Sequence, residues 1–262
     1  MLLSKSTPGS LDGTGFLSGR GFLHSGGSRY LLNYDFTKGF PAALTHTRAS
    51  GATVVDESGN VVWADENLLS DSNPKEWTGS ARVTQTDDFD TSPIAGEDSL
   101  QVLQAAGQTN AGAIYTASIT FTAAAYTLQF RCKDAGKRYV RVLEISSGGN
   151  KHSVFDTQTG IATTLATGHT SASPIDEGDG WFTCFLSFTG TAVSSYIFFY
   201  TSDVGTLNTA VADDSLGYEI AGVQLHRGSD TKPYFPTAGS AYYAPRITHD
   251  AAGNALGYLH EP

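Results

Sequence analysis

The sequence has few charged residues, and positive charges are the scarcest. Charged residues make up 16% of the chain, and 16 Lys and Arg stand against 26 Asp and Glu, which gives a formal net charge of −10. Binding to nucleic acid depends mainly on Lys and Arg that neutralise phosphates, and attraction to anionic membrane surfaces depends on the same residues. We therefore expect no nucleic-acid partner and no membrane insertion, and we attribute the acidic balance to solubility.

Long hydrophobic runs, helical periodicity and cysteine are also scarce. No stretch approaches the roughly 18 apolar residues of a transmembrane helix, and residues 1–6 hold no apolar core of a secretory signal. No segment repeats apolar residues at i, i+3, i+4 and i+7 beyond two turns. The only two cysteines, Cys132 and Cys184, fall in strand-like segments, so we expect buried free thiols.

Strand patterns are abundant instead. Apolar and polar residues alternate along residues 115–122, 126–133 and 182–188, as an antiparallel strand with one buried and one solvated face requires. The first two runs are joined by residues 123–125, which predicts a hairpin. Residues 196–200 are apolar on both faces, which predicts a central strand under cover. The alternation changes phase at Ala221-Gly222, which predicts a β-bulge. Together these patterns predict an all-β, antiparallel, jelly-roll-like β-sandwich.

Residues 1–30 differ from the rest because glycine is dense there. A chain so rich in glycine loses too much backbone entropy to fold alone, yet it carries the apolar side chains Phe16, Leu17, Phe22 and Leu23 in a small repeat. We interpret this segment as an extended N-terminal arm that anchors to a partner. The alternative is that it packs on its own domain.

Several short motifs resemble, in the same order, a carbohydrate-binding-module-like, lectin-like β-sandwich domain of tailed-phage tail-fibre, baseplate and head-fibre proteins. The motifs of the domain itself are Glu66-Asn67-Leu68-Leu69-Ser70 with Trp77, Phe155–Gly160, Asp179–Cys184, Ile220–Leu225 and Tyr234–Thr237. The segments that resemble its usual leader are Tyr34–Thr37, Thr47–Ser50 and Val55–Gly59. Ala244–Asp250 and Leu256–Pro262 resemble the segment that normally precedes such a domain, but here they follow it.

This resemblance implies an arm at 1–30, a leader at 31–65, a β-sandwich at 66–237 and a C-terminal arm, or linker to a further domain, at 238–262. It also implies a structural component on the exterior of a tailed-phage virion, made in the host cytoplasm. Its partners would be other virion proteins and a host cell-surface glycan, and it would form a homo-oligomer such as a trimer. The alternatives are an accessory carbohydrate-binding module of a secreted polysaccharide hydrolase, and a depolymerase.

The sequence offers no catalytic motif and no metal-ligand spacing, so we expect a protein that is not an enzyme, has no cofactor and has no metal site. A structural calcium at Asp176-Glu177-Gly178-Asp179 is not supported, because calcium needs six to eight oxygens. Sugar binding uses aromatic rings beside polar groups. The candidate ligand-binding residues are Trp63, Tyr139, Arg141, Tyr242 and Tyr243. For each of them, packing in the interior is the competing interpretation, and we assign Trp77 and Trp181 to the core.

Overall fold

A computed structural model describes residues 50–206, 216–250 and 252–260, together with the backbone of four short strands before residue 31. Contacts divide the chain into two units, Glu66–Tyr242 and a second one built from 1–65 and 243–262. We describe each unit by itself. The side chains of the predicted anchoring arm, Phe16, Leu17, Phe22 and Leu23, lie outside the described residues.

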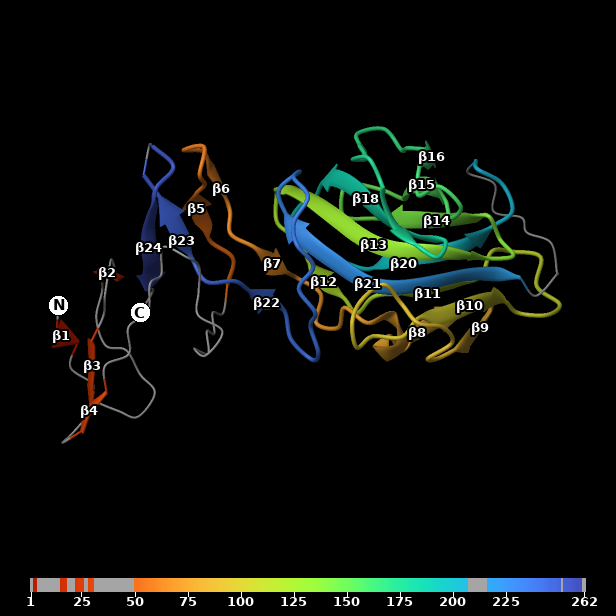
Figure 1. The fold of residues 1–262 in the computed structure, drawn as a ribbon. Helices are drawn as coiled ribbons and strands as arrows, with labels where there is room; N and C mark the ends of the chain where they lie inside the picture. Colours follow the sequence, from red (N-terminus) through yellow and green to blue (C-terminus); the bar gives the residue numbers. More distant parts are fainter. Residues whose placement is uncertain are drawn as a thin grey trace. The chain divides into compact units, whose positions relative to one another are not determined.

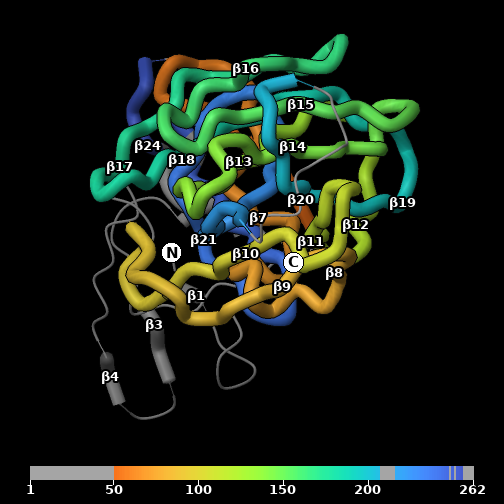
Figure 2. Tube along the Cα trace, turned by 90° about the vertical axis from the view of Figure 1, so that its right-hand side faces the viewer, coloured from red at the N-terminus to blue at the C-terminus, as the bar shows by residue number. Residues whose placement is uncertain are grey.

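The unit Glu66–Tyr242 is an antiparallel, jelly-roll-like β-sandwich of two six-stranded sheets, as predicted (Figures 1 and 2). One sheet, which we call the front sheet although it lies farther from the viewer in Figure 1, has the strand order β16 (Ala162–Thr164), β15 (Lys151–Asp156), β14 (Tyr139–Glu144), β20 (Ile197–Ser202), β11 (Ala113–Tyr115), β8 (Gly79–Ala81). The back sheet has the order β17 (Ile175–Gly178), β18 (Trp181–Thr189), β13 (Ala125–Ala135), β21 (Gly217–Arg227), β10 (Leu100–Gln104), β9 (Val83–Thr86).

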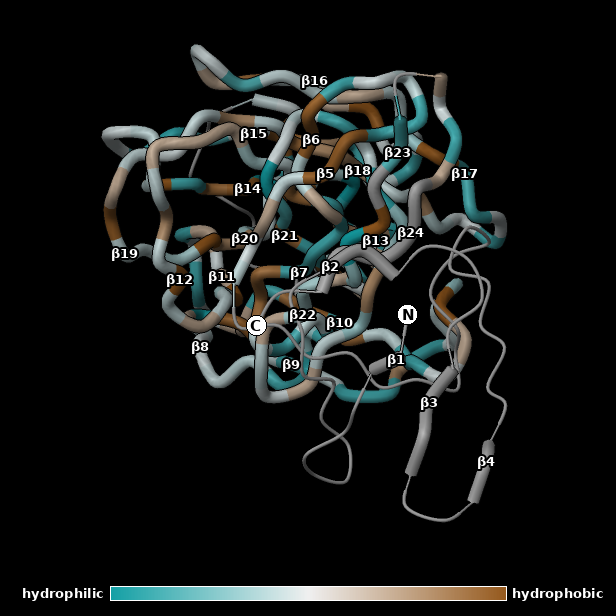
Figure 3. Tube along the Cα trace, turned by 90° about the vertical axis from the view of Figure 1, so that its left-hand side faces the viewer, coloured by the Kyte–Doolittle hydropathy of each residue, from teal (hydrophilic) through white to brown (hydrophobic). Residues whose placement is uncertain are grey.

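The core lies between the two sheets, where alternate residues of each strand turn inward. Phe130 of β13 is the centre of an aromatic cluster, with its ring 5.1 Å from Phe155 of β15 and 5.2 Å from Phe199 of β20. Val140 and Val142 of β14 point to the same interior. Along β14 in Figure 3, hydrophobic and hydrophilic residues follow one another. Burial of these side chains, each worth about 1.5–3 kcal/mol, holds the sheets together.

Three strand-level predictions are confirmed. The alternating run at 182–188 lies in β18, and the run at 196–200 leads into β20, an interior strand between β14 and β11. The bulge also lies where it was expected, because Gln129 pairs with Gln224 while Arg131 pairs with Ala221. Gly222 in the bulge has a φ of +50°, and a Cβ there would lie 1.9 Å from Cδ1 of Ile94. Both conformation and space therefore require glycine.

The predicted hairpin at 115–133 is wrong. Strand β11 ends at Tyr115, and only the two residues of β12 (Ile119–Thr120) are extended before β13 begins. β11 belongs to the front sheet and β13 to the back sheet, so residues 116–124 cross between the layers. β12 pairs with β19 (Ser194–Ser195) instead. Alternation alone predicts which side chains are buried, and a crossing at the end of a sandwich buries alternate residues as a hairpin does.

Two buried polar residues in β7 (Glu66–Asn67) tie the start of the sandwich to residues 225–239, which we call the closing segment. The Asn67 side chain donates to the carbonyl of Phe235 at 2.8 Å and accepts from the backbone N–H groups of Leu69 and Leu225, each at 3.2 Å. Glu66 pairs with Arg227 at 2.9 Å and also accepts from its backbone N–H at 2.9 Å. The Glu-Asn-Leu-Leu motif therefore fastens the two ends of the sandwich to each other.

The other unit contains two hairpins closed by the same turn. One joins β5 (Thr53–Val55) to β6 (Val61–Trp63), and the other joins β23 (Ile247–His249) to β24 (Ala255–His260). In the first turn Asp56 accepts from the backbone N–H of Asn60 at 2.8 Å; in the second Asp250 accepts from that of Asn254 at 2.9 Å. The backbone bond from Asn60 lowers the pKa of Asp56, and bonds from the side chain and then the backbone of Asn254 lower the pKa of Asp250.

Short elements complete the description. The remaining strands are β1 (Leu2–Leu3), β2 (Gly15–Leu17), β3 (Phe22–Ser25), β4 (Ser28–Tyr30) and β22 (Tyr242–Tyr243). In the described part of the chain, the one helical turn is the 3₁₀ helix η2 (Pro74–Glu76), whose N-cap is Asn73. None of these residues forms a helix that is long and apolar enough to cross a membrane.

Cys132 and Cys184 are buried and unbridged, with their Sγ atoms 3.6 Å apart on neighbouring strands. They sit diagonally, because Cys132 pairs with Phe182 and Cys184 with Phe130. Diagonal neighbours have Cα atoms about 7–8 Å apart, beyond the usual 4.4–6.8 Å of a disulfide. Burial and the hydrogen bond with Cys132 also raise the pKa of Cys184, which suppresses its reactive thiolate.

We therefore expect both thiols to survive prolonged incubation of the folded protein with oxidised glutathione. Alkylation after unfolding, read by intact mass, should count two free cysteines. A loss of about 2 Da together with protection of both residues from alkylation would contradict this prediction.

Candidate ligand-binding face

Aromatic side chains gather on the outer face of the front sheet, the face turned away from the core. Arg141 of β14 pairs with Tyr200 of β20, and Tyr115 of β11 pairs with Phe198 of β20. The residues that alternate with these along the strands, such as Val140, point inward. We call this surface the aromatic face. Its residues are Tyr115, Tyr139, Arg141, His152, Tyr196, Phe198 and Tyr200.

The rings form a continuous row across three strands. Tyr115 lies 4.8 Å from Phe198 and 5.7 Å from Tyr196, measured between ring centroids. Phe198 and Tyr200 are stacked at 5.9 Å with an interplanar angle of 23°, and His152 of β15 follows at 6.3 Å from Tyr200. Tyr196 is 42% exposed, so the row was not fully covered as the sequence led us to expect. The other rings of the row, those of Tyr115, Phe198 and Tyr200, are partly exposed.

The hydroxyl groups on this face differ from those in the core. Tyr126 and Tyr218 are buried, and their hydroxyls bond to Thr122 and to the carbonyl of Phe199. The hydroxyls of Tyr115, Tyr196 and Tyr200 have no hydrogen-bond partner among the described residues, and none of them is buried. They are therefore open to water or to a polar ligand.

Arg141 and His152 are the polar side chains of the aromatic face; Arg141 is buried, with 2% of its surface exposed, and His152 is partly exposed. The guanidinium of Arg141 lies 4.7 Å from the ring centroid of Tyr200, a cation–π arrangement. Burial lowers the pKa of Arg141, but the usual pKa of arginine is so high that the guanidinium stays charged. Burial, and then the nearby Arg141, lower the pKa of His152. His152 is therefore neutral at pH 7, and because its Nδ1 is buried, its Nε2 is the nitrogen left to meet a ligand.

The sequence-predicted ligand residues are dispersed by the structure. Tyr139 and Arg141 lie two residues apart on β14, on the same face. Tyr242 stacks on Phe235 at 5.0 Å, away from that row of rings. Trp63 and Tyr243 belong to the other unit. Trp77 and Trp181 are buried, as predicted. The sequence analysis missed Tyr115, Tyr196, Phe198 and Tyr200, because residues 196–200 are apolar throughout and the pairing of β11 with β20 cannot be read from the sequence.

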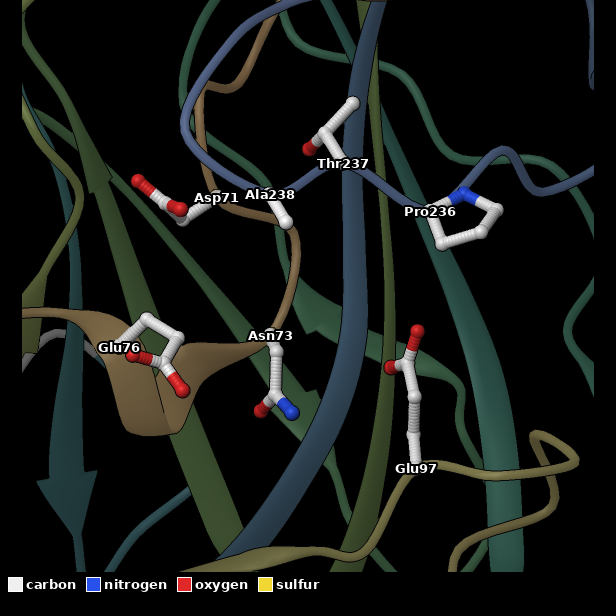
Figure 4. Close-up of a pocket in the computed structure, with 7 residues that line it drawn as sticks. All are labelled: Asp71, Asn73, Glu76, Glu97, Pro236, Thr237 and Ala238. Carbon is white, nitrogen blue, oxygen red and sulfur yellow. The ribbon is translucent and has the colours of Figure 1, made fainter.

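Apart from the aromatic face, the sandwich has an acidic hollow of about 330 Å³ beside η2. Figure 4 shows Asn73 between Glu76 and Glu97, which come from different segments. The remaining lining residues are Asp71, Pro236, Thr237 and Ala238.

Much of the hydrogen-bonding capacity in this hollow is already used. Asp71 accepts from the backbone of Gly239 at 2.8 Å, and Glu97 accepts from the hydroxyl of Tyr234 at 3.0 Å. Burial raises the pKa of Glu97. The hollow has no aromatic ring in its lining, and its side chains serve to hold the closing segment.

A buried trio resembles the side chains of a hydrolase. Ser153 Oγ lies 2.8 Å from His169 Nδ1, and Glu144 Oε2 lies 3.4 Å from His169 Nε2. All three are buried, and Ser153 also accepts from the backbone of Ala166 at 3.3 Å. A nucleophile must reach its substrate, and this one is closed off. The trio fastens the loop around residue 169 to the end of the sandwich.

The acidic turns do not converge on a common point. Asp176 accepts from the backbone of Gly178, and Glu177 faces Arg131 at 3.7 Å. Asp88 and Asp90 pair with Lys75 and Lys133. Within the described ranges, no three His, Cys, Asp or Glu side chains are grouped as a metal site would require.

The sandwich is similar to carbohydrate-binding modules of known structure, at low sequence identity. A family 6 module of lichenase 5A from Cellvibrio mixtus, in complex with cellotriose, has 9% identity and a TM-score of 0.36 over 62% of this chain and 98% of that one. The C-terminal family 6 module of the laminarinase LamC from Zobellia galactanivorans has 13% identity and a TM-score of 0.35 over 58% and 94%. A xylose-bound family 6 module from Clostridium cellulolyticum has 10% identity and a TM-score of 0.31 over 62% and 98%.

No protein-family model matches the chain, and no curated protein sequence is similar to it. At these identities the similarity concerns the fold and does not match individual residues.

Proposed function

We propose that the sandwich binds carbohydrate without catalysing a reaction, and that the aromatic face is its binding surface. The observation that carries this proposal is the row Tyr196–Tyr115–Phe198–Tyr200, in which neighbouring rings lie 4.8–5.9 Å apart. A pyranose has a face of C–H groups that packs on an aromatic ring, and its hydroxyls need hydrogen-bond partners around that ring. The free tyrosine hydroxyls and neutral His152 provide such partners.

Two biological settings would use this interaction. In one, the chain is an exterior component of a tailed phage, and the aromatic face meets a glycan of the bacterial host. In the other, the chain is an accessory module that holds a secreted hydrolase on its polysaccharide. The ligand separates them: a bacterial surface polysaccharide supports the first setting, and plant or storage polysaccharide supports the second. Homo-oligomerisation, for example as a trimer, remains a prediction for the phage setting.

We expect Tyr196→Ala and Tyr200→Ala each to weaken binding about tenfold, equivalent to 1.4 kcal/mol, because each removes one stacking surface and one hydroxyl. Titration calorimetry against soluble gluco-, xylo-, manno- and galacto-oligosaccharides and against bacterial capsule would measure this. Phe89→Ala is the matched control, since Phe89 is 48% exposed and lies in a loop of the same unit.

Unchanged affinity in both tyrosine variants would place the ligand elsewhere. Failure of the unaltered protein to bind any of these carbohydrates would refute the proposal. Steady release of reducing sugar from any of them would show that the protein is an enzyme after all.

A further inference from the structure

Gly79 stands in strand β8 at the edge of the front sheet, directly opposite Tyr115 of β11. Its φ lies outside the left-handed region, so the backbone conformation would accept any L-residue. Glycine weakens a strand, because it loses more backbone entropy on folding than other residues and brings no side chain to pack. Something other than backbone conformation must therefore account for glycine here.

Space accounts for it. A Cβ on Gly79 would lie 2.2 Å from Cε2, 2.4 Å from Cδ2 and 2.6 Å from Cζ of Tyr115, far inside van der Waals contact. Three atoms of one ring at such short range mean that the ring lies across the Gly79 backbone. Any side chain at position 79 would push it away, because the ring can move more easily than the backbone.

The position of this ring decides what the end of the aromatic face offers a ligand. The face of an aromatic ring carries partial negative charge and its edge partial positive charge. A ring lying flat on β8 turns its face to solvent, which attracts the C–H groups of a sugar. A ring lifted away from the strand would lose its contacts with Phe198 at 4.8 Å and Tyr196 at 5.7 Å and would expose its edge.

We propose that Gly79 is a positioning residue: it lets Tyr115 lie flat across β8 and so extends the aromatic face to the edge of the front sheet, where it stacks on the C–H face of a neutral pyranoside. This inference rests on the proposed function. A purely structural role, in which the ring only shields the glycine backbone from water, predicts a change in stability with no change in ligand affinity.

The test uses the full chain with Gly79→Ala, Tyr115→Ala and the double variant. Ser80→Ala is the control, because Ser80 is exposed on the same strand and pairs with Ile114, so its side chain lies on the other face of the sheet from Tyr115. The first measurement needs no ligand: the rate at which tetranitromethane nitrates Tyr115, located by peptide mass spectrometry. Nitration occurs at Cε, and Cε2 is the atom covered by Gly79. Gly79→Ala should raise this rate several-fold, and Ser80→Ala should not. An unchanged rate would overturn the inference.

The second measurement is affinity, by calorimetry with the best-bound oligosaccharide of the panel above, well below the melting temperature of each variant. Gly79→Ala and Tyr115→Ala should each weaken binding about tenfold, and the double variant should be no weaker than Tyr115→Ala alone. Additive losses, or full affinity in Gly79→Ala with a raised nitration rate, would refute the ligand role of Gly79. Absence of binding by the unaltered protein refutes the proposed function instead. The nitration rates then test only whether Gly79 positions the Tyr115 ring.

A third measurement covers the case in which Gly79→Ala folds poorly. Removing the ring removes the clash, and alanine is a better strand residue than glycine. The double variant should therefore melt at a higher temperature than Gly79→Ala, so that Tyr115→Ala rescues it. A double variant that melts below both single variants would show that the ring and residue 79 do not compete for the same space.

Discussion

Glu66→Ala is expected to lower the free energy of unfolding by about 3–5 kcal/mol, since it removes one partner of a buried ion pair and leaves the charge of Arg227 uncompensated. Glu66 is fully buried, and its carboxylate accepts from the Arg227 guanidinium at 2.9 and 3.2 Å and from the Arg227 backbone N–H at 2.9 Å. The Arg227 side chain is only 15% exposed, so water replaces the lost carboxylate poorly. A loss of this size is a large part of the stability of an ordinary domain.

Denaturant unfolding followed by tryptophan fluorescence would measure the effect, because Trp77 and Trp181 are buried in the sandwich. Glu76→Ala is the control: Glu76 is an exposed glutamate of the same unit, and we expect a change within about 0.5 kcal/mol. If Glu66→Ala unfolds at the denaturant concentration of the control, the pair has no role in holding the closing segment.

Asn67→Ala is expected to cost about 3 kcal/mol of unfolding free energy, because it leaves three backbone groups, two buried and one partly buried, without a partner at about 1 kcal/mol each. The three are the carbonyl of Phe235 and the N–H groups of Leu69 and Leu225. Asn73→Ala offers a comparison with a single bond, since Asn73 accepts only from the backbone of Lys75 at 3.2 Å, as the N-cap of η2.

We expect Asn73→Ala to cost about 1 kcal/mol. The same unfolding experiment, run on both asparagine variants, gives the ratio of the two losses. Equal losses would mean that the Asn67 side chain adds nothing beyond an ordinary cap.

The strands could be predicted from the sequence, but their partners could only partly be predicted. Alternation located β18 and β13, and the change of phase located the bulge at Gly222, because each depends on residues adjacent in the chain. The hairpin at 115–133 was wrong, since alternation carries no information about which sheet a strand joins. The crossing of residues 116–124 depends on contacts such as Thr116 with Ile197, whose backbone groups bond at 3.1 Å.

The aromatic face was harder to predict for the same reason. Tyr139 and Arg141, both candidates from the sequence, lie on one side of β14 because their spacing is two, but Arg141 is buried there. Residues 196–200 read as apolar on both sides, and nothing local to them distinguishes the inner ring of Phe199 from the outer ring of Phe198. Tyr115 joins that surface only through the register of β11 with β20, and Gly79 only through β8. These are relations between distant segments.

The hydrogen bonds of Asn67 to Leu225 and Phe235 join residues that lie 158 and 168 positions apart in the chain. A nascent chain on the ribosome cannot make these bonds until about the whole sandwich has been synthesised, because Phe235 comes near the end of that unit. A β-protein with such distant pairings has a high contact order and folds on the slow side, on the order of milliseconds to seconds. Until then β13 and β18 expose apolar faces, so the yield of folded protein should depend on chaperones and on the rate of synthesis.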